Sequence, residues 1–142
     1  MDASSGAVRA KAGVDGQAWN ILDQIYIPMA VTQTSFIWDA TLPADSFVPR
    51  HVHPNQDEFI YILEGELELV LGQEDVKIGR GDMVTMPMNV PHSIHNRSGK
   101  PVRAIFSVSP TNLTYEYFQK INNMTDRDAM AALAAEHDLP FV

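Results

Sequence analysis

Two histidines separated by one residue, His51 and His53, are the first side chains in this sequence that could do chemistry. Residues two apart in a strand point to the same face, so the two imidazoles should lie a few ångströms apart. Such a doublet is more often hydrogen-bonded or solvent-facing than metal-bound, although neutral imidazole is a frequent metal ligand. The pair therefore raises the hypothesis of a metal site without deciding it.

Glu58 follows the doublet after a short turn, and its expected orientation connects it to the histidines. The segment Leu63-Glu64-Gly65-Glu66 is typical of a hairpin with a two-residue turn, in which Glu58 would pair with Leu71. Alternation then places Glu58 on the all-apolar face of this hairpin, together with Ile60, Ile62, Leu67, Leu69 and Leu71. An unpaired carboxylate on such an interior face is costly, so Glu58 needs a cation or hydrogen-bond donors.

A third histidine, His92, follows Pro91 at the start of another predicted strand. Three imidazole nitrogens and one carboxylate form a borderline-to-hard ligand set that suits Fe(II), Mn, Co, Ni, Cu or Zn. The chain has no cysteine, so no thiolate can take part.

Three other side chains are rivals for the same role. The hairpin register sends Asp57 to the face opposite Glu58. His95, three residues after His92, should face away from it, towards the surface or an interface. His137 lies in a predicted C-terminal helix and should be solvated.

The elements that must position these side chains are β-strands. From Trp19 to Val108 the sequence consists of short β-branched and aromatic segments separated by Pro, Gly, Asn and Asp. Many short strands in one domain indicate a sandwich or closed barrel. The predicted strands are 25–31, 34–41, 47–53, 58–63, 66–72, 75–79, 83–87, 91–96 and 102–109.

The segments that flank the barrel differ from it in character. Residues 1–18 are rich in Gly, Ala and Ser and should form a mobile arm, so the domain proper is 19–142 with its barrel at about 25–109. Two helices are expected within about 113–138, at 113–121 and 125–138, the second with Thr125 as N-cap. Its apolar positions Met130, Leu133 and Ala134 recur at helical spacing, so this helix should pack against the barrel.

Length and charge narrow the class of protein. The 142 residues fit one domain. Eighteen acidic and ten basic residues give a net charge of −8, which disfavours nucleic acid or an anionic membrane surface as partners. With no apolar run of membrane-spanning length and no signal-peptide pattern, the expected location is the cytoplasm.

Two linked motifs resemble those of the cupin family. The first is His51-Val52-His53, four residues, Glu58, six residues, Gly65; the second is Gly81, five residues, Pro87, then His92, three residues, Asn96. The resemblance covers about residues 40–110. It implies an antiparallel double-stranded β-helix, a jelly-roll barrel, as in small single-domain cupins. It also implies that His51, His53, Glu58 and His92 bind one divalent transition metal ion.

Two family glycines are replaced in this chain, by Asp45 before the first motif and by Asn89 within the second. Both family glycines are expected in turns with positive φ. Asn and Asp tolerate that region best among residues with side chains, so the replacements should strain the backbone little and remove no ligand.

The resemblance also suggests several functions. The first is a metal-dependent dioxygenase similar to quercetin-dioxygenase-like cupins, acting on a small aromatic or enolisable substrate, with Glu58 as both ligand and general base. The second is a non-redox cyclase, isomerase or lyase similar to the small cupins of aromatic polyketide pathways. The third is a non-catalytic module that binds a small molecule.

Apolar side chains near the motifs suggest a substrate pocket and a dimer contact. Such stripes are more often core, yet an aromatic and methionine lining would suit a flat, apolar substrate. The candidate lining residues are Phe36, Trp38, Phe47 and Met86. Phe59 and Tyr61 should face outward, which together with the resemblance suggests a homodimer.

Overall fold

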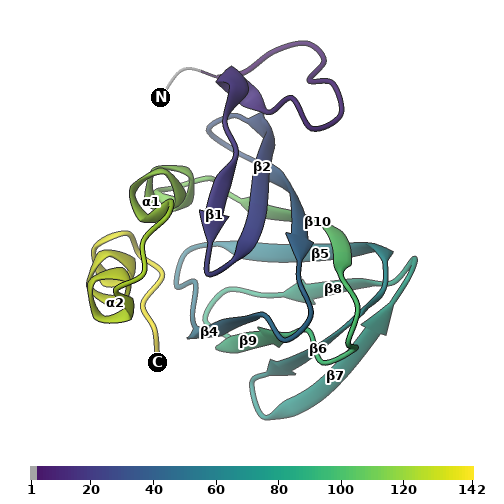
Figure 1. The fold of residues 1–142 in the computed structure, drawn as a ribbon. Coiled ribbons are helices and arrows are strands. Elements are labelled where there is room, and N and C mark those ends of the chain that lie inside the picture. Colours follow the sequence, from purple (N-terminus) through teal and green to yellow (C-terminus); the bar gives the residue numbers. More distant parts are fainter. Residues whose placement is uncertain (1–2) are drawn as a thin grey trace.

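The computed structural model describes residues 3–142, which form two antiparallel sheets facing each other (Figure 1). Six strands lie in the order β1-β2-β3-β10-β5-β8 and four in the order β4-β9-β6-β7. The predicted antiparallel double-stranded β-helix is thus confirmed. The strands are β1 Trp19–Ile21, β2 Gln24–Val31, β3 Phe36–Leu42, β4 Phe47–His51, β5 Asp57–Glu64, β6 Glu66–Leu71, β7 Glu74–Gly79, β8 Met83–Met86, β9 His92–His95 and β10 Val102–Ser109.

The core fills the space between the two sheets because inward and outward side chains alternate along each strand. In β10, for example, every second residue from Val102 to Val108 is buried. Aromatic rings dominate one half of this core: Trp38 stacks on Phe106 with 5.4 Å between centroids, and Phe36 lies 4.7 Å from Trp38.

The predicted hairpin between β5 and β6 is wrong. β5 pairs with β10 on one side and β8 on the other, so neither edge of β5 is free for β6, which joins the other sheet. The chain passes from the six-stranded sheet to the four-stranded sheet at Gly65, whose φ is 89°. The predicted interior face survives because alternation does not depend on the partner strand. Glu58, Ile60, Ile62, Leu67 and Leu69 are buried, whereas Leu71 is half-buried.

The barrel also begins earlier than predicted. β1 pairs with β2 through the two-residue turn Leu22–Asp23, in which both φ angles are positive, 52° and 67°. Neither residue is Gly or Asn, so the usual sequence signal of such a turn is missing. Residues 1–2 of the predicted arm lie outside the described residues. Further along the arm, Ser4 N donates to Val31 O at 2.8 Å and Val14–Gly16 form the 3₁₀ helix η1. The mobility of the arm stays a prediction.

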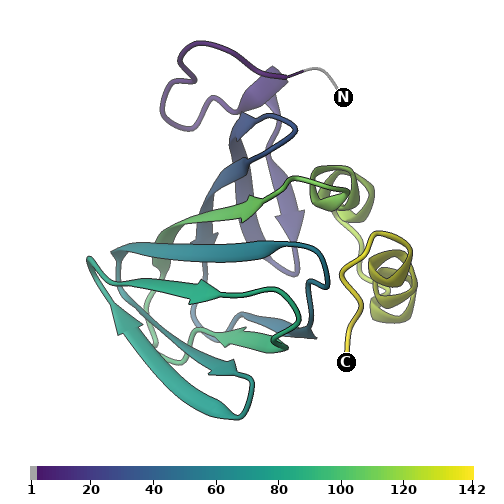
Figure 2. The ribbon, with the colours of Figure 1, turned by 180° about the vertical axis from the view of Figure 1, so that it is seen from behind.

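Two helices, α1 (Thr114–Ile121) and α2 (Arg127–Glu136), lie beside one end of the barrel (Figures 1 and 2). Of the three apolar positions predicted to pack, Met130 and Ala134 of α2 are buried and Leu133 is half-buried. The N-cap is Asp126, not Thr125, because the Asp126 carboxylate accepts from the backbone amides of residues 128 and 129. No helix within residues 3–142 is both long and apolar enough to cross a membrane.

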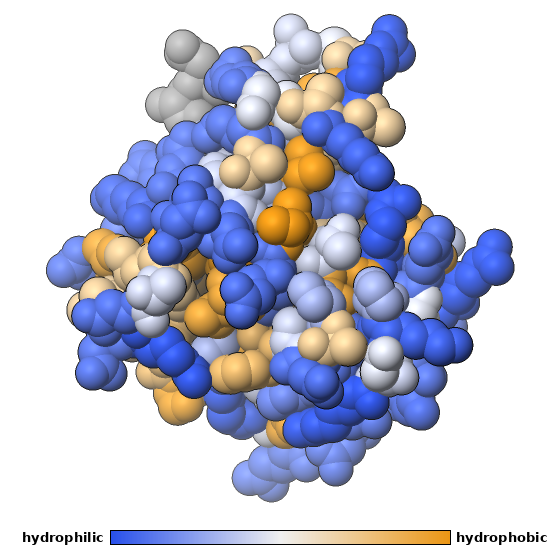
Figure 3. All heavy atoms as spheres, viewed as in Figure 1, coloured by the Kyte–Doolittle hydropathy of each residue, from blue (hydrophilic) through white to orange (hydrophobic). Residues whose placement is uncertain are grey.

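The hydrophobic residues at the surface bear on two predictions, the outward orientation of Phe59 and Tyr61 and the formation of a homodimer. Figure 3 shows a mainly hydrophilic face on which hydrophobic side chains appear over β2 and between the helices and the barrel. On the outer face of the six-stranded sheet, Tyr61 is 39% exposed and lies opposite Met83, which is 61% exposed. Phe59 is half-buried on the same face. Association through this face stays a prediction.

The two residues that stand in place of the family glycines have the positive φ expected at these turns. Asp45 has φ 66° and Asn89 has φ 63°. Both residues are exposed, and each backbone amide is hydrogen-bonded: Asp45 N donates to Asn96 O at 2.9 Å and Asn89 N to His53 O at 3.0 Å. The departures from the family motifs therefore preserve the turns.

Gly65→Ala should destabilise the fold more than Gly81→Ala. The two glycines have nearly equal φ, 89° and 86°, so each substitution carries a conformational cost of about 1 kcal/mol. A Cβ at Gly65 would also lie 2.9 Å from Val102 Cγ2, whereas nothing lies within 4 Å at Gly81. Urea unfolding should show an additional loss of about 1–3 kcal/mol at Gly65. Equal losses for the two variants would contradict the tight corner.

Candidate metal centre

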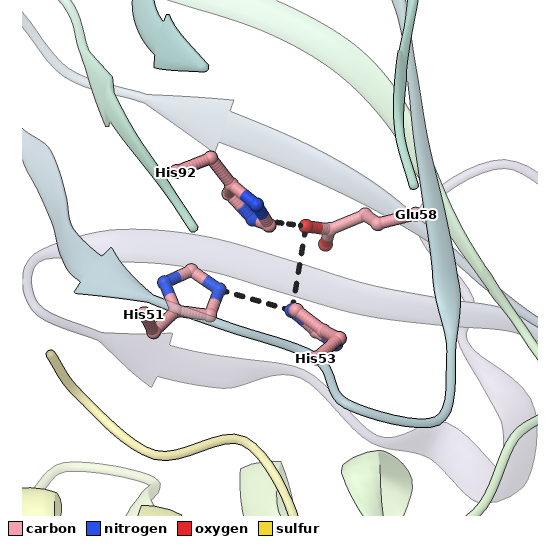
Figure 4. Close-up of side chains that lie close together, drawn as sticks. All are labelled: His51, His53, Glu58 and His92. Atoms are coloured by element: carbon pink, nitrogen blue, oxygen red, sulfur yellow. Dashed lines mark hydrogen bonds and ion pairs between the residues drawn. The ribbon is translucent and has the colours of Figure 1, made fainter. Parts of the chain in front are cut away.

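Four buried side chains, His51, His53, Glu58 and His92, point toward one another at one end of the barrel (Figure 4). His51 ends β4 and lies directly opposite His92, the first residue of β9. The loop after β4 carries His53 and crosses to the six-stranded sheet, where Glu58 is the second residue of β5. One ligand atom from each residue lies within 4.8 Å of all the others.

An irregularity in β4 aims His51 inward. The register between β4 and β9 shifts between Val48 and His51, so that β4 holds one more residue than its partner over this stretch. Pro49 lies in the bulge, which an edge strand such as β4 tolerates because proline cannot donate to a ladder. Bulges commonly redirect a side chain beside a functional site. His53 lies beyond the end of β4, not in a continuous strand 47–53 as predicted.

The distances within the cluster match the spacing of ligands around one ion. His51 Nε2 lies 3.0 Å from His53 Nε2, His92 Nε2 lies 2.9 Å from Glu58 Oε1, and His53 Nε2 lies 3.6 Å from Glu58 Oε1. Ligands about 2.1 Å from a metal are separated by ~3.0 Å at right angles and ~3.4 Å at tetrahedral angles. A single transition-metal ion would satisfy all three separations.

Each imidazole is oriented by an acceptor on its far nitrogen. His51 Nδ1 donates to Pro49 O at 2.7 Å and His92 Nδ1 to Val90 O at 3.3 Å. Backbone carbonyls only accept, so these Nδ1 atoms carry the protons. His53 Nδ1 lies 2.6 Å from Gln56 Oε1. The Nε2 atoms are thereby left with lone pairs directed at the cluster, which is the arrangement of metal-bound histidines.

The donor set therefore calls for a cation. His51 Nδ1 and His53 Nδ1 each face an oxygen that only accepts, so both carry a proton. His51 Nε2 and His53 Nε2 then bring two lone pairs to 3.0 Å, which is repulsive unless a proton or metal ion lies between them. A proton could serve one such contact, whereas a metal ion serves all four donors together. The residues present thus fit a divalent metal ion.

Burial and mutual charge set the pKa values of the cluster. Burial, followed by the neighbouring His92 and His53, lowers the pKa of His51 from 6.5 to about 3. Burial alone would raise the pKa of Glu58, but its electrostatic interactions with the adjacent His53, His92 and His51 outweigh burial and lower that pKa to about 2. At neutral pH His51 is neutral and Glu58 is an anion, the states that bind metal.

Sequence reasoning missed Gln56, a buried residue that contacts the cluster. Its side chain lies between His53 and the start of α1, where Thr114 Oγ1 donates to Gln56 Oε1 at 2.9 Å. Its position in the turn between two candidate ligands was the available signal, because a side-chain acceptor there can reach back to His53.

The three rival side chains lie outside the cluster. Asp57 accepts from the Met88 amide at 3.0 Å, on the face opposite Glu58. His95 lies against the Phe47 ring, away from the cluster. The prediction of a solvated His137 is wrong, because this residue caps the C-terminal end of α2 and is only 5% exposed. Lys120 Nζ lies 2.9 Å from its Nε2.

An apolar cavity of about 50 Å³ adjoins the cluster, with His51, His53 and Glu58 on its wall. Of the four predicted substrate contacts, only Trp38 lines this cavity. Phe36 and Met86 are buried in the core, and Phe47 lies outside beneath the guanidinium of Arg127. The remaining wall comes partly from the helices and the C-terminal segment, whose positions local sequence patterns do not reveal. Besides Trp38, the aromatic residues that line the cavity are Tyr26, Phe106, Tyr117, Phe118 and Phe141.

Comparisons with known proteins agree with this geometry. Residues 38–108 match the family model described as the cupin domain. The chain is 32% identical over 84 residues to the tetracenomycin polyketide synthase protein TcmJ of Streptomyces glaucescens, a match covering 58% of this chain and 56% of TcmJ. It is 41% identical over 54 residues to quercetin 2,3-dioxygenase of Bacillus subtilis strain 168, covering 38% of this chain and 16% of that protein.

A solved structure shows the same fold. The RmlC-like cupin from Shewanella frigidimarina NCIMB 400 superposes with a TM-score of 0.71 at 15% identity, covering 81% of this chain and 99% of that one. The fold, the motifs and the family match together show that this chain belongs to the cupin family. The chain spans little more than half the length of TcmJ, so the activity of the whole relative does not follow from the match.

His92→Ala should weaken metal binding strongly, since it removes one of four converging donors. His95→Ala is the matched control, because His95 belongs to the same strand but lies outside the cluster. Zinc titration against a competing chelator should show one site in the parent protein and in His95→Ala, and at least ~10-fold weaker binding in His92→Ala. Equal affinity of the two variants would show that His92 is not a ligand.

In protein stripped of metal, stability should fall as the pH drops from 6.5 towards 3. Over this range the unfolded chain protonates His51 and the folded chain does not, so the free energy of unfolding falls by up to about 1.4 kcal/mol per pH unit. Glu58 adds to the loss as the pH falls from 4.5 towards 2. Urea unfolding of His51→Gln should show a shallower pH dependence, and an unchanged slope would count against the buried neutral imidazole.

Proposed function

We propose that this cupin is a metal-dependent enzyme that oxidises a small aromatic or enolisable molecule with dioxygen. The observation that carries the proposal is the convergence of three imidazoles and Glu58 on the wall of an apolar cavity. We assign His51, His53, Glu58 and His92 as the ligands. A bound divalent transition metal would supply Lewis acidity and, if redox-active, a means of activating dioxygen.

The polar atoms of the cavity favour a neutral, hydroxylated substrate. Tyr26 Oη donates to Gln24 Oε1 at 2.6 Å, and this amide is oriented by donation of its Nε2 to Phe47 O. Tyr117 Oη donates to Met130 O. Burial raises the pKa of both tyrosines, so both stay protonated and offer only lone pairs to a ligand hydroxyl.

Trp38 lines the cavity, but its indole nitrogen is buried. Trp38 Nε1 is the buried side-chain polar atom that lacks a hydrogen-bond partner within the described part of the chain. No lysine or arginine of the described residues lines the cavity, which disfavours a phosphate or carboxylate substrate.

Glu58 is the acid of the cavity wall and the group placed to take a proton from a substrate hydroxyl. Its lowered pKa keeps Glu58 an anion at neutral pH. General-base action therefore suits a substrate whose hydroxyl is itself acidic, such as an enol or phenol beside a carbonyl.

The size of the cavity sets a condition on substrate entry. A cavity of about 150 Å³ is known to take benzene, whereas this one measures about 50 Å³. The segment after α2 closes one side: Val52 N donates to Pro140 O, Val142 N donates to Arg50 O, and Phe141 lines the wall. An aromatic substrate therefore requires the cavity to widen, and we expect this segment to move.

A non-redox reaction on a polyketide-type substrate is the second candidate. The match to the polyketide synthase protein TcmJ covers 58% of this chain, against 38% for the dioxygenase. With the same ligands, a metal acting only as a Lewis acid would support cyclisation, isomerisation or elimination.

Oxygen consumption separates the two candidates. Protein loaded with Fe(II), Mn, Co, Ni or Cu should consume dioxygen with quercetin or the smaller catechol, and zinc-loaded protein should not. His53→Ala should abolish this uptake, while His95→Ala, outside the cluster, should retain it. Substrate turnover that proceeds equally under argon would favour the second candidate. Binding of both probes without turnover under any metal would contradict the proposed oxidation.

A further inference from the structure

We propose that Gln56 is a positioning residue that holds His53 in its metal-binding tautomer and connects it to helix α1. This inference rests on the proposed metal site. The other two histidines are oriented by backbone carbonyls, so His53 is the ligand whose orientation depends on a side chain.

The orientation of the Gln56 amide is settled by its surroundings. Gln56 Nε2 donates to Pro110 O at 2.8 Å and to Thr111 O at 2.9 Å. Carbonyl oxygens only accept, so the amide nitrogen must face them and Oε1 must face His53. The side chain is 3% exposed, and both its amide nitrogen and its oxygen have hydrogen-bond partners within the protein.

The tautomer of His53 follows from that orientation. Gln56 Oε1 has no proton to give, so the 2.6 Å contact requires His53 Nδ1 to donate. His53 Nε2 then keeps its lone pair, which faces His51 Nε2 and Glu58 Oε1. With this acceptor removed, the proton could move to Nε2 and block the metal-binding atom.

Gln56 also links the metal site to the cavity. Its Oε1 accepts a second bond from Thr114, the first residue of α1. Tyr117 and Phe118, one helical turn after Thr114, and Ile121, two turns after it, line the cavity. A ligand that displaces α1 would therefore act on His53 through two consecutive hydrogen bonds.

Two substitutions separate positioning from mere structural support. Gln56→Met keeps the volume but removes the acceptor, whereas Gln56→Glu keeps an acceptor for His53 and loses both donors to the carbonyls. Gln24→Met is the control, since Gln24 is equally buried on the cavity wall but contacts Tyr26 and Phe47 O, not a histidine.

Zinc affinity, measured by chelator competition, should fall about 10- to 100-fold in Gln56→Met. Gln56→Glu should bind zinc at least as tightly as the parent protein, although it unfolds at lower urea concentration because a carboxylate faces two carbonyls. Gln24→Met should also lose stability but keep the parent zinc affinity. If zinc affinity instead follows stability across all three variants, Gln56 is only a structural residue.

The tautomer itself provides a readout that needs no metal. Long-range ¹H–¹⁵N NMR on the chelator-treated parent protein should show His53 protonated at Nδ1, and Gln56→Met should show a mixture or the Nε2 form. A parent protein with His53 protonated at Nε2 would overturn the inference, even if Gln56→Met fails to fold. Absence of zinc binding together with the Nδ1 tautomer would refute the metal site and leave the role of Gln56 intact.

Discussion

His51 Nε2 and His53 Nε2 approach to 3.0 Å, and this close approach of two ring nitrogens is what a bound cation must stabilise. The far nitrogen of each ring is engaged by an acceptor, so two lone pairs face each other in a buried setting beside a carboxylate. In low dielectric such a group is unfavourable without a cation. The surrounding architecture fixes the tautomers and buries the four donors, an arrangement that could hold a metal ion.

The fold supplies these donors from both of its sheets. Ladder pairing brings His51 opposite His92, and the bulge at Pro49 directs His51 inward while providing the carbonyl that orients it. The loop that leaves β4 crosses to the other sheet and brings in Glu58. On the open side, α1 and the C-terminal segment complete an apolar cavity, so the metal-binding atoms and the space for a small molecule share one wall.

Local sequence patterns predicted strand spans and side-chain orientations. They failed for features that depend on residues distant in the sequence, such as strand partners and the burial of single side chains. The span of β10 and the inward face of Glu58 follow from alternation, which holds whatever strand lies alongside. The partner of β5 could not be read from its own residues, because β10 is distant in sequence. The same limit hid the burial of His137 beside Lys120, the cavity wall contributed by α1, and Gln56, whose role appears only when residues 110–114 lie beside it.

Anomalous X-ray scattering from crystals grown with zinc would show whether the four side chains bind one metal ion. A metal-binding cluster predicts one strong peak at the end of the barrel, about 2.0–2.2 Å from Nε2 of His51, His53 and His92 and from a carboxylate oxygen of Glu58. It also predicts that each Nδ1 keeps its present acceptor, so the rings turn little on binding. Zinc found only at surface carboxylates, with the four side chains placed as they are here, would contradict it.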